Sequence, residues 1–347
     1  MEISNQERVY QDLHGRISSG EFSAGEKLPS LRDLSIQYGI SVGAVRQGLL
    51  KLESEHLVRP QHGRGYYVAR ERDAIRVLLV ESAIHDHLFS EYVEAFQGIV
   101  SGLPTGVLVM ESAEPCARKE LCRPQELFRK LEMHVDSGVD VCFFDGEKAW
   151  GITPKQFQSL GERVKLFYFN TAYPHFLTVG IPGVSIDWYV GGYRALRHLI
   201  DIGCRNVICA FTPDTEARQG AMDAVKDSRQ KVELHVFDPR GNLGDTELYP
   251  LIQRREIDGL FSNSDALLLG GLSLFASCGY GVHDLAMIGS FDTPWCELSS
   301  LTLSSLNVQP QKMVQTVWDM YQGKIPVCQM RLQPELILRD STLKFRR

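Results

Sequence analysis

Arg46 and Gln47 are adjacent polar residues on the expected exposed face of a short helix, which also carries Val42 and Gly43. Side chains of these types on such a face can reach base edges in the major groove of double-stranded DNA. The pair therefore predicts contact with DNA, and the surrounding chain should position the helix for that contact.

A helix-turn-helix unit is predicted around this pair. Ser30 is expected to cap one helix, Gly39 to end it in the left-handed conformation, and Ser41 to cap the next. An earlier helix, from about residue 7 to residue 18, completes a three-helix unit. The last helix should bury three apolar residues at helical spacing: Val45, Leu49 and Leu52.

A two-stranded wing should follow the third helix. Residues 57–60 and 66–68 have an extended pattern, and His62, Gly63 and Arg64 lie in the turn between them. Glycines at the tip allow close approach to phosphates or to the minor groove, and Arg64 supplies positive charge. The alternative is that the three helices and the hairpin only pack or dimerise.

The net charge of -6 argues against nucleic acid as a partner until it is divided along the chain. Residues 1–72 contain ten Lys/Arg and nine Asp/Glu, whereas residues 73–347 contain 27 and 34. DNA binding by the first segment must therefore depend on where its basic residues lie. Those in or beside the predicted unit are Arg32, Arg46, Arg59, His62, Arg64 and Arg70.

Residues 7–69 resemble the winged-helix domain of GntR-type transcription factors. The resemblance is carried by Gly20-Glu21, residues 25–30, Arg32, Val45-Arg46 and the Gly-x-Gly wing. The family often has Ser-Arg-Thr-Thr where this chain has residues 41–44, Ser-Val-Gly-Ala, so an arginine and two hydroxyls are absent from the expected DNA face. The resemblance implies DNA contacts from Ser30, Arg32, Ser41, Arg46, His62, Gly63 and Arg64, to which the exposed face adds Gln47.

The rest of the chain predicts a doubly wound α/β body. Residues 1–70 form the expected winged domain and 71–74 a short charged linker, after which apolar runs of strand length alternate with amphipathic helical patterns. The runs are at 75–80, 106–110, 139–144, 164–169, 206–211, 231–237, 258–261 and 285–289, and the helical patterns are at 89–101, 124–137, 189–202, 215–226, 264–278 and 310–322. A body of this length favours two parallel sheets.

Ligands of such sheets bind beyond the carboxyl ends of the strands, so the residues after each run are candidates for a site. They include 85–89, 170–173, 212–218, 263–265 and 291–295. Carboxylates and amides among them can bind hydroxyls, and aromatic rings can cover the apolar side of a sugar or stack on a base. A small neutral polyol or a nucleobase-like ligand is predicted.

This half also resembles the periplasmic-binding-protein-like effector domain of LacI-type regulators. The matching segments are 184–187 with Gly191-Gly192, 198–203, 218–220 with Ala224, 258–261 and 288–292. The resemblance covers about residues 75–340 and implies a type I fold with two subdomains, 75–172 with 297–323 and 173–296 with 324–340. A winged head on such a body resembles the arabinose-responsive repressors.

The family's ligand contacts map to Asp86, Leu88, Phe89, Asp187, Arg218, Asp265, Asp292 and Trp295, and Tyr173 joins them from the strand-end residues. Each has a simpler interpretation. Arg218 could form a surface ion pair, Asp187 could only cap a helix, and Asp292 could cap a turn. Trp295 could pack in the core, and Ser264 stands where many members have asparagine.

No cofactor is predicted. His85 and His87 lack a third convergent ligand for a metal site, and no phosphate loop, nucleophile elbow or H-E-x-x-H motif occurs. The first residues are polar and the longest apolar stretch, 266–276, is interrupted by glycines, so a cytoplasmic chain without a membrane partner is expected. The eight cysteines have no C-x-x-C pairing and should be reduced thiols.

The main hypothesis is a ligand-responsive transcription factor, a repressor and not an enzyme. Its expected partners are double-stranded operator DNA, a small effector that is most simply a sugar, and a second copy of the chain, because one winged helix reads few base pairs. Two alternatives stay open: a DNA-binding protein whose body serves only dimerisation, and an enzyme with a regulatory DNA-binding head.

Overall fold

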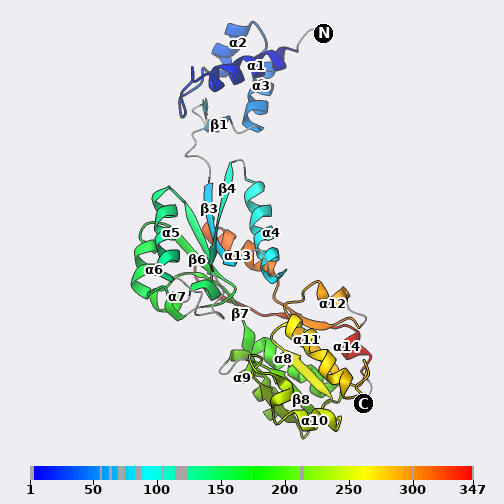
Figure 1. Cartoon of the computed structure of the whole chain (residues 1–347). Coiled ribbons are helices and arrows are strands. Elements are labelled where there is room, and N and C mark those ends of the chain that lie inside the picture. Colours follow the sequence, from blue (N-terminus) through cyan, green and yellow to red (C-terminus); the bar gives the residue numbers. More distant parts are fainter. Residues whose placement is uncertain are drawn as a thin grey trace.

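The computed structural model describes residues 4–54, 57–61, 65–68, 75–82, 87–103, 105–113, 124–149, 151–172, 174–211, 215–298 and 301–345. A small head at residues 4–68 is followed by a body of two lobes (Figure 1). Lobe 1 lies next to the head, and lobe 2 contains the C-terminal end of the chain. Within these residues no helix is both long and apolar enough to cross a membrane.

The head contains α1 (Asn5–Ser18), α2 (Leu31–Tyr38) and α3 (Val42–Ser54). Ser30 and Asp33 form a reciprocal capping box at the start of α2, and Gly39 ends that helix at φ 66°. Ser41 Oγ accepts from the Ala44 amide at 3.2 Å and so caps α3. The core of the head includes Val9, Leu13, Leu34, Val45, Leu49 and Leu52, each fully buried. The predicted helix-turn-helix is therefore confirmed.

The wing is an antiparallel pair of β1 (Val58–Gln61) and β2 (Gly65–Val68). Its second strand is tied to the segment before α2, because the Leu28 amide donates to the Tyr66 carbonyl and the Val68 amide to the Glu26 carbonyl. Val58 and Val68 are buried in the core of the head. The wing is thus a rigid extension of the three-helix unit.

The two glycines of α3 have different environments. A Cβ on Gly48 would lie 2.9 Å from the Gln6 carbonyl oxygen and 3.0 Å from the Val9 side chain, whereas a Cβ on Gly43 would meet nothing closer than Ser41 Oγ at 3.9 Å. We expect Gly48→Ala to destabilise the head by about 1–3 kcal/mol through overpacking. Gly43→Ala should stabilise it by up to about 1 kcal/mol through helix propensity. Hydrogen exchange of the α1 and α3 amides measures the stability change caused by each substitution. Equal changes would contradict the conclusion that only Gly48 is required for packing.

Lobe 1 is built on a six-stranded sheet in the order β13-β7-β6-β5-β3-β4. All its strand pairs are parallel. In that order the strands are β13 (Gln329–Leu332), β7 (Gly183–Ile186), β6 (Lys165–Phe169), β5 (Val141–Asp145), β3 (Ile75–Ser82) and β4 (Gly106–Ala113). The helices are α4 (His87–Ser101), α5 (Pro124–Asp136), η2 (Gly146–Ala149), α6 (Pro154–Gly161), α7 (Pro174–Val179) and α13 (Pro310–Tyr321).

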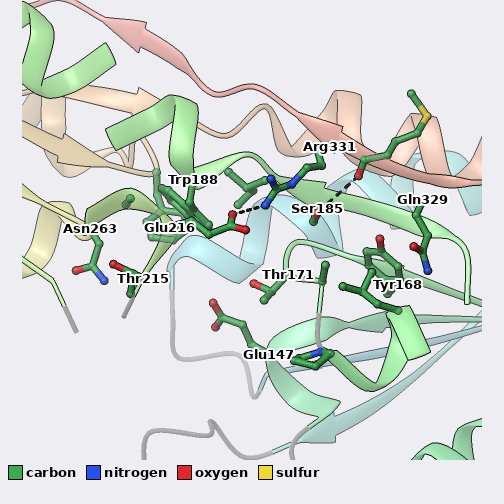
Figure 2. Close-up of a pocket in the computed structure, with 17 residues that line it drawn as sticks. Glu147, Tyr168, Thr171, Ser185, Trp188, Thr215, Glu216, Asn263, Gln329 and Arg331 are labelled. Atoms are coloured by element: carbon green, nitrogen blue, oxygen red, sulfur yellow. Dashed lines mark hydrogen bonds and ion pairs between the residues drawn. The ribbon is translucent and has the colours of Figure 1, made fainter. Parts of the chain in front are cut away.

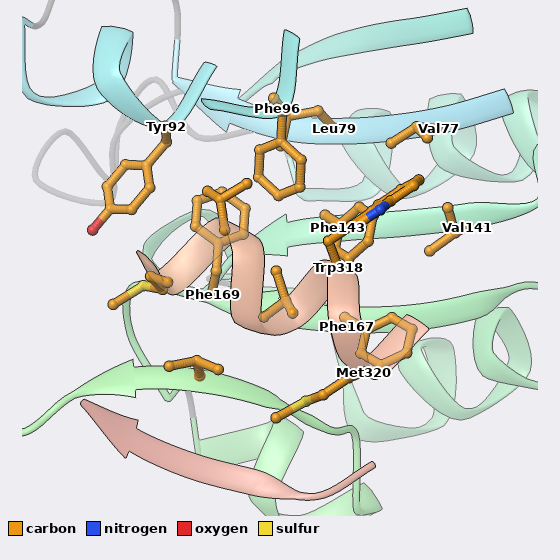
Figure 3. Close-up of a cluster of buried hydrophobic side chains, with 14 of the residues drawn as sticks. Val77, Leu79, Tyr92, Phe96, Val141, Phe143, Phe167, Phe169, Trp318 and Met320 are labelled. Carbon is orange, nitrogen blue, oxygen red and sulfur yellow. The ribbon is translucent and has the colours of Figure 1, made fainter. Parts of the chain in front are cut away.

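Alternate residues of the central strands enter two separate cores. Val77, Leu79, Phe143 and their equivalents pack against α4 and α13, with the Phe143 and Trp318 ring centroids 6.0 Å apart (Figure 3). Leu78, Val80 and Phe144 point the other way, toward α5, α6 and α7. Because neighbouring strand residues point to opposite faces, these near-continuous apolar runs fill both sides of the sheet.

Lobe 2 repeats this arrangement with the sheet order β14-β12-β11-β10-β8-β9, in which only β12 and β14 are antiparallel. In that order the strands are β14 (Glu335–Ile337), β12 (Ser304–Asn307), β11 (Ala286–Ser290), β10 (Gly259–Ser262), β8 (Asn206–Ala210) and β9 (Glu233–Phe237). The helices are α8 (Trp188–Asp201), α9 (Glu216–Lys226), η3 (Leu243–Asp245), α10 (Tyr249–Gln253), α11 (Asp265–Ser277), α12 (Trp295–Leu298) and α14 (Asp340–Leu343). The predicted fold class, a winged helix-turn-helix head on a two-sheet doubly wound body, is confirmed.

Three strands lie in a different lobe from the one expected from the sequence. β7 and β13 belong to the sheet of lobe 1, although residues 173–296 and 324–340 were expected in lobe 2. β12 belongs to lobe 2, although residues 297–323 were expected in lobe 1. The reason is that the chain crosses between lobes at the ends of these strands, near Asp187, Gln309 and Gln333, and not at the bounds that the resemblance implied.

Candidate functional site

The exposed face of α3 presents the residues predicted to contact DNA. Val42 is 42% exposed, and Gly43, Arg46 and Gln47 are also exposed, while Val45 on the opposite side is fully buried. The helix is anchored in the head by that buried side, so its polar side faces outward. This is the geometry in which a recognition helix can enter a major groove.

Arg46 lies beside the wing. Burial raises the pKa of Tyr66 on β2, the Glu53 charge adds to that effect, and the nearby Arg46 guanidinium opposes it. The side chain expected to read a base is therefore close to the wing.

The other predicted DNA contacts divide into three groups. Ser30 and Ser41 are both exposed, but their hydroxyls already serve as helix caps. Arg32 is exposed on the first turn of α2. His62, Gly63 and Arg64, the expected tip of the wing, lie outside the described residues.

A cavity of about 980 Å³ lies between the two lobes (Figure 2). Glu147, Tyr168 and Thr171 line it from lobe 1, and Thr215 and Asn263 line it from lobe 2. Between them, β7 and the edge strand β13 form one wall. The full lining is Glu147, Tyr168, Thr171, Ala172, Pro174, Leu177, Ser185, Ile186, Trp188, Thr215, Glu216, Ala217, Asn263, Phe291, Gln329, Met330 and Arg331.

An ion pair spans the cavity between the lobes. Arg331 of β13 is hydrogen-bonded to the Glu216 carboxylate on the first turn of α9, and its guanidinium lies 4.0 Å from Asp187 (Figure 2). The hydrogen bond to Glu216 raises the pKa of Arg331. Arg331 is thus already paired with carboxylates, and the rest of the described lining contains the Glu147 carboxylate together with hydroxyls, amides and aromatic faces.

Asn263 has an unused hydrogen-bonding atom in this cavity. Its side-chain oxygen is buried and has no hydrogen-bond partner among the residues that the structure describes. It lies close to Thr215 in lobe 2, across the cavity from Thr171 and Glu147 (Figure 2). A buried acceptor without a partner is costly, and a hydroxyl of a bound molecule would satisfy it.

Five of the predicted ligand contacts lie outside the cavity lining. Asp187 caps α8 by accepting from the Val190 amide at 3.2 Å, which is its simpler interpretation. Arg218 lies near the start of α9 with its Nε buried and without a hydrogen-bond partner. Trp295 starts α12 and is 46% exposed.

Asp265 and Asp292 are engaged by the protein itself. Asp265 is buried, and its oxygens accept from the Thr293 amide at 2.9 Å, the Thr293 hydroxyl at 3.0 Å and the Ser305 hydroxyl at 2.7 Å. Burial raises the pKa of Asp265, and these hydrogen bonds oppose it. Asp292 pairs with Arg339 at 2.6 Å and accepts from Asn307 at 3.0 Å.

Asp86 and Tyr173 lie outside the described residues, and so do the side chains of Leu88 and Phe89. The same holds for His85 and for the side chain of His87, which were not expected to bind a metal. Within the described residues no cluster of three His, Cys, Asp or Glu side chains suits a metal.

Sequence reasoning missed most of the cavity wall. Ser185, Gln329 and Arg331 lie on β7 and β13, which were not predicted as strands. Thr171, Thr215 and Asn263 do lie in segments singled out because they follow apolar runs. The signal that located these segments was their position at the carboxyl end of a strand, and the residues predicted as ligand contacts are mostly neighbours of those that line this cavity.

Comparison with known families agrees with both halves of this structure. Residues 5–68 match the family described as bacterial regulatory proteins, gntR family, and residues 196–342 match the periplasmic binding protein-like domain. The chain joins a GntR-type head to a periplasmic-binding-protein-like body. Both resemblances predicted from the sequence are thereby confirmed.

Proteins of known name match parts of this chain. The arabinose metabolism transcriptional repressor of Geobacillus stearothermophilus is 23% identical over 216 residues, which are 60% of this chain and 56% of that protein. The Uxu operon regulator of Haemophilus influenzae is 40% identical over 70 residues, 20% of this chain and 26% of that protein. The chain thus spans little more than half the length of these relatives at most.

Solved structures show the fold of the body. A LacI family regulator from Weissella paramesenteroides with bound sucrose has a TM-score of 0.62 at 16% identity, covering 78% of this chain and 100% of that one. A LacI family regulator from Arthrobacter sp. FB24 in complex with lactose has a TM-score of 0.61 at 17% identity, covering 78% and 99%.

Proposed function

We propose that this protein is a ligand-responsive, sequence-specific DNA-binding transcriptional regulator, a repressor and not an enzyme. The observation that carries the proposal is the combination, in one chain, of an outward-facing Arg46-Gln47 helix and an interlobe cavity of about 980 Å³. Relatives named as transcriptional regulators, among them the arabinose repressor, support it.

The ligand we propose is a neutral, hydroxyl-rich molecule, most simply a sugar. Arg331 is paired with Glu216, while Thr171, Thr215 and Asn263 offer neutral hydrogen-bonding groups beside the rings of Tyr168 and Trp188. Such a lining suits sugar hydroxyls and the apolar face of a sugar ring. The sucrose and lactose bound by structural relatives support this class of ligand.

Regulation would act through a homodimer, because a single winged helix reads too few base pairs for a specific site. A ligand that bridges the two lobes would change their relative orientation, and with it the spacing of two heads. A coupling of about 1–3 kcal/mol between ligand and DNA would change operator affinity roughly 5- to 150-fold.

The test is a titration of selected operator duplexes with the full chain, with and without a panel of sugars. Sequence-selective, salt-dependent binding that a sugar changes at least fivefold is the expected result. Selective binding that no ligand affects, together with no sugar-induced rise in melting temperature, would indicate a body that serves only dimerisation. Conversion of a bound sugar into product would indicate an enzyme.

Asn263→Ala should weaken binding of such a sugar by about tenfold, because one hydrogen bond of about 1.5 kcal/mol is lost. Isothermal titration measures this effect. Asn242→Ala is the matched control, since Asn242 lies in the same lobe but its side chain bonds to Gly244 and Asp245 outside this cavity. Equal affinities for the Asn263 variant and the unmodified chain would place the ligand elsewhere.

A further inference from the structure

Gly43 is a glycine that no contact within the described head explains. Its backbone is helical, and a Cβ at this position would meet nothing closer than 3.9 Å. An alanine there would favour the helix by about 1 kcal/mol. Gly48, in the same helix, is explained by its contact with Gln6 and Val9. The open space at Gly43 lies on the exposed face of α3, and none of the described residues fills it.

The first turn of α3 is therefore both flat and apolar. Val42 is 42% exposed, Gly43 has no side chain, and Ala44 has one methyl. The capping hydroxyl of Ser41 is engaged by the Ala44 amide. Hydrogen-bonding side chains start again only at Arg46 and Gln47, one turn later.

We propose that Val42 reads the methyl group of a thymine, and that Gly43 lets the helix approach the base edge closely enough for that contact. This inference rests on the proposed DNA-binding function and names the base that the start of the recognition helix selects. Arg46 and Gln47 would then contact the neighbouring base pairs.

The chemistry of the major groove supports this assignment. Thymine alone among the four bases presents a methyl group there, and it is read by apolar contact. The N-terminal residues of a recognition helix are those that reach base edges. An exposed valine beside a residue without a side chain offers an apolar surface and no competing side-chain hydrogen-bond donor. We therefore expect the operator to have A·T pairs facing this turn of α3.

The experiment first selects high-affinity duplexes from a randomised library with the full-length protein. Each thymine in the selected half-site is then replaced by uracil, which removes only the methyl group. At one position the unmodified protein should lose about fourfold in affinity, the value of one methyl-sized apolar contact. Val42→Ala should bind the thymine and uracil duplexes equally.

Leu50→Ala is the matched control, because Leu50 is 41% exposed on the same face, eight residues and about 12 Å further along the helix. It should retain the full discrimination between thymine and uracil. Gly43→Leu should raise the stability of the head through helix propensity while lowering operator affinity about tenfold, and loss of folding cannot produce this combination.

The outcomes separate the two proposals. If no sequence is enriched, the proposed function is wrong. If a specific operator is selected while every uracil substitution lowers the affinity of the unmodified protein and of Val42→Ala equally, the proposed DNA binding stands. In that case the proposed contact between Val42 and a thymine methyl group is overturned. A selected half-site without thymine overturns it as well.

Discussion

Replacing Arg46 with alanine is expected to lower affinity for the selected operator by roughly 5- to 150-fold, in line with about 1–3 kcal/mol for a paired contact to a base. Affinity for random duplex should fall much less. The reason is that Arg46 is exposed on the face of α3 that points away from the head. Fluorescence anisotropy with both duplexes at one fixed salt concentration gives the two values.

Lys51 provides a charge-matched control on the same helix. Its ammonium group lies 3.0 Å from Glu7 and over the Tyr10 ring, so it faces α1 and not the outer face. Lys51→Ala removes the same charge but should leave the ratio of specific to random binding unchanged. If the two variants lose that ratio equally, net charge and not a base contact accounts for the effect.

Asp265→Ala is expected to destabilise the body by about 3–5 kcal/mol, although the resemblance to LacI-type regulators implied a ligand contact at this position. The carboxylate is buried and holds the start of α11 to Thr293 and Ser305 through three hydrogen bonds. Its removal leaves a cavity and buried donors without partners. All four tryptophans lie after residue 149, so tryptophan fluorescence during urea unfolding reports the body and not the head.

Two further variants test this interpretation of Asp265. Asp201→Ala removes an exposed carboxylate whose pair with Arg197 spans one helical turn, so its cost should stay below about 0.5 kcal/mol. Gly289→Ala should be destabilising like Asp265→Ala, because a Cβ there would lie 1.9 Å from the Asp265 carboxylate. An Asp265→Ala chain that unfolds like the unmodified protein but no longer binds sugar would restore the ligand-contact hypothesis.

The elements that are set by local chemistry could be predicted from the sequence. Ser30, Gly39 and Ser41 act within one helical turn of the chain, and the caps and the turn were found where their residue types predicted them. The long apolar runs gave eight of the strands in the two lobes, since strands buried on both faces have a distinct pattern.

The features that depend on distant partners could not be predicted in this way. β13, Gln-Met-Arg-Leu, is a short edge strand whose residues are mostly exposed, so its pattern does not differ from that of a loop. Asp292 was expected to face a ligand, but Arg339, 47 residues later, binds it. Proximity of that kind follows from the sheet order and not from spacing along the chain.

The positions of the consecutive strands β13 and β14 affect when the two sheets can be completed during synthesis of the protein. They are separated by two residues, yet β13 closes the edge of the lobe 1 sheet and β14 the edge of the lobe 2 sheet. Most of lobe 1 leaves the ribosome long before residue 329, so both sheets stay incomplete until residues 329–337 have been synthesised. Loss of this one short segment would therefore remove an edge strand from both lobes at once.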